Sequence, residues 1–132
     1  MVKDQEVYKI LNQLNNQTIV EFALAGSEVM VRAIDQSTKL SFSTTIYQGS
    51  SYIPTSVRSS LSKALPKGSI PTYINVDEED YRITLHYLGR LEGMHPAQLK
   101  VLLEEFAVIA EDWRQVLDDM DNNDRVYIYN KR

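Results

Sequence analysis

The spacing of apolar residues near the N-terminus predicts a helix. Val7, Ile10, Leu11 and Leu14 recur at i, i+3, i+4 and i+7, so they share one face of a helix over residues 4–15. The residues between them are polar, as expected for an amphipathic helix that packs one side on a core. This helix is the first predicted element.

The longest predicted element is a helix in the C-terminal part of the chain. It follows Gly93 and begins at Pro96, because proline suits a first helical position. Its continuous apolar stripe, which we expect to lie in the core, consists of Leu99, Leu102, Leu103, Phe106, Ala110, Trp113, Leu117 and Met120. Polar residues 121–124 are expected to end the helix. Residues 126–129 would then form an apolar-aromatic tail that adds a strand or docks on a partner.

Apolar and polar residues alternate in the region between these helices, which predicts strands. The alternating stretches are residues 18–25, 28–34, 40–46, 70–76 and 81–88. Short turns at Gly26-Ser27 and at residues 35–38 join the first three strands into an antiparallel meander. Pro71 cannot donate to a strand ladder, so it indicates either that the fourth strand lies at a sheet edge or that the strand starts there. An acidic turn at 77–80 is expected after this strand.

A short helix is predicted between the meander and the last two strands. It spans residues 54–65, between a Pro-Thr-Ser start and the Pro66-Lys67-Gly68 stop. The predicted fold class is therefore α+β, in the order helix, three-stranded antiparallel meander, helix, two strands and long C-terminal helix. With 132 residues the chain is expected to form one domain, residues 1–132, of which 121–132 are the polar turn and tail.

Composition narrows the possible partners. The formal net charge of -4 disfavours nucleic acid and anionic membranes, which both need clustered positive charge. The absence of cysteine excludes disulfides, thiolate nucleophiles and zinc-thiolate sites. No stretch approaches the roughly 18 consecutive apolar residues of a membrane-spanning helix, and we expect no signal for membrane insertion or Sec-dependent export.

Enzyme signatures are absent from the sequence. Only two histidines, His86 and His95, could serve as neutral-pH acids or bases, and each is more simply explained by a structural role. No nucleophile elbow, dinucleotide-binding turn, phosphate loop or zinc-protease motif occurs. We therefore expect a protein that binds another polypeptide, without catalytic residues and without a cofactor.

One acidic stretch resembles a calcium-binding loop only in part. Asp119, Asp121 and Asn123 match the first three ligand positions of such a loop. Asp124 stands where the loop needs glycine, and Asn130 where it needs a bidentate glutamate. The acidic residues are therefore interpreted as solvated charge near a helix end, and no metal site is expected.

Tyrosines are the other candidates for a contact surface, because tyrosine combines rigid apolar area with a polar tip. Five of the eight tyrosines fall outside the main apolar stripes or near the ends of predicted elements: Tyr8, Tyr47, Tyr52, Tyr127 and Tyr129. These five are the better candidates for the surface, and core packing accounts for about half of the tyrosines.

The predicted order of elements, in an acidic chain of this size, resembles the class I type III secretion chaperones over nearly the whole chain. The local stretch from Leu102-Leu103-Glu104-Glu105-Phe106 through Ala110, Trp113 and Leu117 is similar to the final helix of that family. Within the family the chain looks most like the small chlamydial subunits that pair with a different subunit to serve the gatekeeper protein CopN. The tail after residue 125 departs from the simplest family pattern.

The resemblance implies a cytoplasmic chaperone without a cofactor. Such a protein binds a secreted effector or gatekeeper protein, keeps it export-competent, and pairs with itself or with another chaperone subunit. The client is expected to bind through whichever residues of one apolar set remain exposed. This client-binding set is Ile10, Leu14, Ile19, Phe22, Val29 and Val31. The residues implied for dimerisation are Val57, Leu61 and Leu65.

Two alternatives remain open at this point. The six client-binding candidates could instead be core residues beneath the first and last helices. The protein could also be a regulator that binds RNA polymerase or its sigma factor and couples secretion to transcription, since an acidic surface suits a basic partner.

Overall fold

A computed structural model describes the backbone of residues 3–16, 19–24, 27–61 and 70–130, and the side chains of these residues except 15, 16, 24, 27 and 123–130. The elements in chain order are α1 (Asp4–Asn16), β1 (Ile19–Leu24), β2 (Ser27–Ile34), β3 (Lys39–Gln48), α2 (Thr55–Ser60), β4 (Tyr73–Asp77), β5 (Arg82–Arg90) and α3 (Pro96–Asn130). This order confirms the predicted α+β fold class. No described helix is long and apolar enough to cross a membrane.

The five strands form one antiparallel sheet in the order β1-β2-β3-β5-β4. The meander is confirmed, and β4 lies at a sheet edge, one of the two placements that Pro71 indicates. Ser27 already belongs to β2 and pairs with Leu24, so the predicted turn at Gly26-Ser27 is one residue too late. Its glycine lies outside the described residues.

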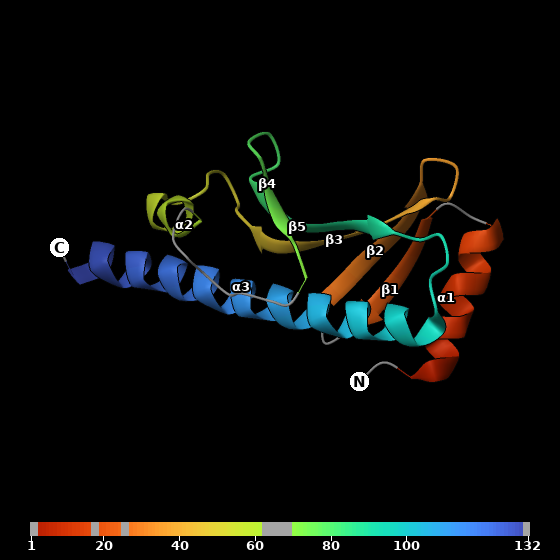
Figure 1. Cartoon of the computed structure of the whole chain (residues 1–132). Coiled ribbons are helices and arrows are strands. Elements are labelled where there is room, and N and C mark those ends of the chain that lie inside the picture. The colour runs from red at the N-terminus through yellow and green to blue at the C-terminus, as the bar shows by residue number, and fades with distance from the viewer. Residues whose placement is uncertain (1–2, 17–18, 25–26, 62–69, 131–132) are drawn as a thin grey trace.

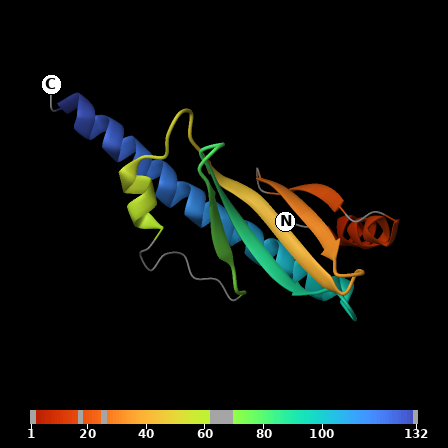
Figure 2. The same cartoon turned by 90° about the horizontal axis from the view of Figure 1, so that it is seen from above.

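The long helix α3 covers one face of the sheet, and the other face is not covered by any described helix (Figures 1 and 2). The core lies between α3 and the sheet. At its centre the Phe42 ring of β3 packs against Phe106 of α3 and Tyr87 of β5, with centroid distances of 5.4 and 5.2 Å. Trp113 is buried in the same core, as predicted. We call the uncovered side the open face.

The two short helices pack at opposite ends of α3 (Figure 1). Helix α1 buries Val7, Ile10 and Leu14, and an ion pair of 3.0 Å joins its first residue, Asp4, to Lys100. These three buried residues share one helical face, as their spacing in the sequence predicts, because only that face of α1 packs on the core.

Helix α2 lies against the C-terminal half of α3. The Ser56 hydroxyl donates a hydrogen bond of 3.2 Å to the Met120 carbonyl. On its outer side, Arg58 makes a bidentate pair with Glu78 in the turn after β4, with both N–O distances 2.6 Å. Helix α2 ends at Ser60, and the part of the predicted helix beyond Leu61 lies outside the described residues.

The predicted end of the last helix at residues 121–124 is wrong, because α3 continues to Asn130. Asparagine and aspartate cost only about 0.5–0.7 kcal/mol each in a helix interior relative to alanine, and no glycine or proline follows Pro96 to stop the helix. Residues 126–129 therefore lie on the helix and form no strand. This part of α3 projects beyond the sheet (Figures 1 and 2).

Candidate functional site

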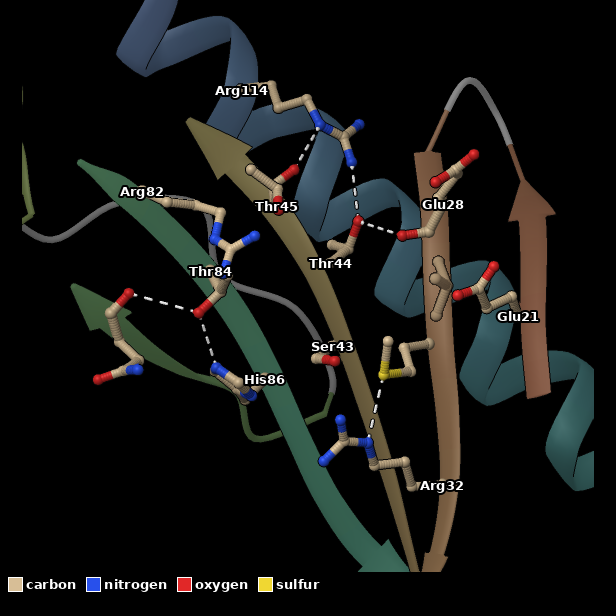
Figure 3. A pocket seen from close by; sticks show the side chains of 13 residues that line it. Glu21, Glu28, Arg32, Ser43, Thr44, Thr45, Arg82, Thr84, His86 and Arg114 are labelled. Atoms are coloured by element: carbon tan, nitrogen blue, oxygen red, sulfur yellow. Dashed lines mark hydrogen bonds between the residues drawn. The ribbon is translucent and has the colours of Figure 1, made fainter. Parts of the chain in front are cut away.

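The open face is hollowed along its central strand. Ser43 and Thr45 of β3 line this hollow and carry short side chains, whereas longer side chains flank them on both neighbouring strands. Arg32 of β2 is in register with Ser41, and His86 of β5 with Ser43. The result is a groove of about 530 Å³, shown in Figure 3, which we call the β3 groove.

One end of the groove is closed by an arginine from the helix layer. Arg114 of α3 donates hydrogen bonds to the Thr45 carbonyl (3.2 Å), the Thr44 hydroxyl (3.3 Å) and Glu111 (3.2 Å). The Thr44 hydroxyl in turn donates to the carbonyl of Glu28, 2.9 Å away, beyond the point where the pairing between β2 and β3 ends. These bonds satisfy backbone groups that β2 no longer pairs, so this end of the groove is fixed by the fold.

His86 forms the middle of one groove wall. Its Nε2 lies 2.8 Å from the Thr84 hydroxyl, and its ring stacks on Tyr73 with centroids 5.0 Å apart and an interplanar angle of 10°. Partial burial lowers the pKa of His86 below its ordinary value, and the positive charge of Arg32 lowers it further. The imidazole is therefore neutral at pH 7.

The lowered pKa of His86 predicts a pH dependence of stability. The unfolded chain takes up the proton at the ordinary value near 6.5, and the folded protein only at lower pH. Acidification from pH 7.5 to 5.5 therefore favours unfolding, and stability should fall over this range. Thermal unfolding of His86→Gln should show a flatter pH profile than the wild type. Parallel profiles would show that His86 does not carry this dependence.

The six residues implied for client binding do not share one exposed surface. Four of them, Ile10, Leu14, Val29 and Val31, are buried at 6% exposure or less and form part of the core. They expose little surface in this conformation, because α1 and strand β2 turn them toward α3. Phe22 is half-buried on the same side of the sheet.

Only Ile19 is exposed, at 44%. It lies on the open face in register with Arg32, and the exposed Ile34 is two residues further along β2. Leu88 of β5 is also exposed on this face, in the same row as Ile19 but separated from it by β2 and β3. The part of the client-binding prediction that remains is therefore an apolar rim at one end of the open face. We call Ile19, Ile34 and Leu88 the apolar rim.

The residues implied for dimerisation are also divided. Val57 is fully buried, because α2 turns it inward, so it is not available as a surface anchor. Leu61 is partly buried and packs against the edge of the core, which leaves part of its side chain accessible. Leu65 lies outside the described residues. Dimerisation through α2 stays a prediction that depends on Leu61.

The tyrosines expected at the surface differ in outcome. Tyr8 and Tyr52 are exposed, but Tyr47 is buried. A bulge between Thr45 and Tyr47 breaks the strand alternation, so both Ile46 and Tyr47 face the core. The side chains of Tyr127 and Tyr129 lie outside the described residues.

The remaining candidate chemistry is sparse in the described part of the chain. No group of three histidine, aspartate or glutamate side chains there could hold a metal ion. His95 begins α3, where its backbone N–H donates to the Gln98 side chain at 2.9 Å. This is a helix-capping contact of the backbone, and the structural role expected for the His95 side chain stays a prediction.

Comparisons with known proteins identify the fold. Neither protein-family models nor curated protein sequences match this chain. Among solved structures, the heterodimeric ExoU–SpcU complex from the type III secretion system of Pseudomonas aeruginosa matches with TM-score 0.55 and 16% identity, over 79% of this chain and 84% of that one. The ExoT–SpcS complex of the same bacterium matches with TM-score 0.54 and 14% identity, over 82% and 93%.

A third similar structure is that of the type III secretion chaperone SycH of Yersinia pestis in complex with a protein fragment. It matches with TM-score 0.50 and 13% identity, over 82% of this chain and 97% of that one. The chain therefore has the fold of type III secretion chaperones, which confirms the predicted resemblance at the level of the fold. The narrower resemblance to the chlamydial CopN chaperone subunits stays a prediction.

Proposed function

We propose that this protein is a type III secretion chaperone, which binds a secreted effector or gatekeeper protein in the cytoplasm and keeps it export-competent. The observation that carries the proposal is a chaperone fold that extends over most of the chain and leaves one sheet face uncovered. A fold built this way can hold an extended polypeptide without any catalytic group.

The chemistry of the open face supports this role. The apolar rim offers contact area to a client side chain, and the strands β1 and β4 at the two sheet edges have unpaired backbone groups for an added strand. Backbone hydrogen bonds at an edge are independent of client sequence, whereas the rim and the groove add selectivity. The alternative role, binding of RNA polymerase or its sigma factor, stays untested.

We expect Ile19→Asp to weaken client binding without unfolding the protein. Ile19 is exposed on an edge strand, so a carboxylate there stays hydrated, but it removes apolar area from the rim. Co-purification of the variant with a secretion substrate should fall by about tenfold, the effect of one interface anchor. Lys9→Asp, on the exposed side of α1, is the control. Wild-type client recovery with Ile19→Asp would exclude the rim as the binding surface.

The proposal includes a second chaperone subunit, identical or different. Leu61→Asp should dissociate such a dimer while helical content is retained, since Leu61 lies at the accessible end of α2. Size exclusion with light scattering, on the chain alone and with candidate partner chaperones, measures the outcome. An unchanged dimer mass for the variant would move the interface away from α2.

A further inference from the structure

Charge is distributed unevenly over this protein. The whole chain has a formal net charge of -4, yet cationic groups outnumber anionic ones in the β3 groove. The charged and titratable residues that line it are Arg32, Arg82, Arg114, His86, Glu21 and Glu28. Figure 3 shows the two glutamates on the β1–β2 side, and Arg82 and His86 on the opposite wall. With His86 neutral, three arginines line the groove against two glutamates, a small positive excess on an acidic protein.

Two of these arginines have donor groups that the fold leaves unused. The Nε of Arg32 is 3.2 Å from the Met30 sulfur, a weak acceptor, and Arg32 has no acidic side chain within ion-pair distance among the described residues. The Nε of Arg82 is buried without any hydrogen-bond partner in the described part of the protein. Its Nη2 forms an exposed ion pair of 3.4 Å with Asp80, which a client carboxylate would have to join or replace. By contrast, the donors of Arg114 are engaged in the contacts given above.

The register of the strands places these unused donors along one line. Arg32 stands beside Ser41, and Arg82 pairs with Gln48 beyond the Thr45–Thr84 pair. The hydroxyl-bearing floor of β3 runs between the two guanidinium groups, and His86 lies midway. Planar guanidinium donors suit carboxylates, because they can bind both oxygens. A ligand that meets both arginines must therefore be extended along β3.

We infer that the β3 groove binds an extended acidic segment of a client polypeptide, with carboxylates on Arg32 and Arg82. The segment carries its acidic side chains an even number of residues apart, because only such residues share one face of an extended chain. Its apolar residues lie on the adjacent apolar rim. This inference rests on the proposed chaperone function and names the chemistry of the client.

Peptide binding tests the inference directly. The probe is a fluorescein-labelled ten-residue peptide that alternates threonine and glutamate, and the comparison peptides carry glutamine or lysine in place of glutamate. The glutamate peptide should bind the full-length protein, the other two should not, and affinity should fall as salt rises. The double variant Arg32→Gln/Arg82→Gln should bind at least about tenfold more weakly. Lys9→Gln/Arg58→Gln removes the same charge outside the groove and should leave affinity unchanged.

Several results would overturn the inference. They are equal binding of the glutamine peptide, unchanged affinity in the groove variant, or equal loss in the control variant. Competition by inorganic phosphate at the concentration of the peptide would show a small-anion site instead. A change of molecular mass in light scattering for the groove variant would assign the groove to a contact between copies of the chain. Circular dichroism verifies that both double variants are folded.

The same variants separate this inference from the proposed function. If the groove variant still co-purifies with a secretion substrate and the acidic peptide does not bind, the assignment of an acidic segment to the β3 groove is wrong but the chaperone role stands. If no secretion substrate binds the wild type, the chaperone role fails, whatever the peptides show.

Discussion

Trp113→Ala is expected to destabilise the protein by about 3–5 kcal/mol, the usual cost of a large aromatic side chain lost from a core. Trp113 is 7% exposed and lies on the face of α3 that packs on the sheet. Its truncation leaves a cavity that the rigid strands opposite cannot fill. Urea unfolding followed by circular dichroism measures the change in the free energy of unfolding.

The matched control for this prediction is Asp112→Ala, one position earlier on the exposed side of α3. It should change stability by no more than about 0.5 kcal/mol. If Trp113→Ala were as stable as the wild type but failed to bind its client, Trp113 would belong to the client surface and the core assignment would be wrong.

Val31→Asp should prevent folding, whereas Ile34→Asp on the same strand should not. Val31 is completely buried between β2 and α3, and an unpaired carboxylate there costs several kcal/mol, a large part of the stability of a domain this size. Ile34 is 37% exposed on the open face, where a carboxylate remains in water. Both variants introduce a carboxylate into the same strand, so a difference in folding between them reflects the face of the sheet on which each residue lies.

Soluble yield and near-UV circular dichroism distinguish the two variants. The burial of Val31 argues against a role in client binding. A Val31→Asp protein that is folded but no longer binds its client would contradict this and make Val31 a client contact. An unfolded Ile34→Asp protein would show that the open face is covered in the native assembly, for example by a partner subunit.

The sequence was sufficient for the order of elements because each has a regular apolar period. Its limits lie at particular residues. The bulge before Tyr47 inserts one residue into β3, so the residues after it point to the opposite face from the one that alternation predicts. The alternation of apolar and polar residues cannot by itself locate such an insertion. The end of α3 was misplaced because aspartate and asparagine weaken a helix without stopping it.

The candidate site was less accessible to sequence reasoning than the fold. Ile19 and Val31 lie on adjacent strands and are both apolar, but they point to opposite faces, as the alternation along each strand requires. Which face is covered depends on where α3 packs, and no local pattern contains that information. The β3 groove was missed for the same reason, since Arg32 and Arg82 are neighbours of β3 only through strand register.

The central claim, that this protein holds a secreted polypeptide in a non-globular state, is tested most directly by hydrogen exchange on a co-purified complex. The chain is co-expressed with each secretion substrate encoded in the same genome, and complexes that survive size exclusion are analysed. The account predicts a client segment whose amides are protected only in the complex, and new protection on the open face or edge strands of this chain. Co-elution of no secretion substrate, or a bound client segment that is equally protected without this protein, would contradict it.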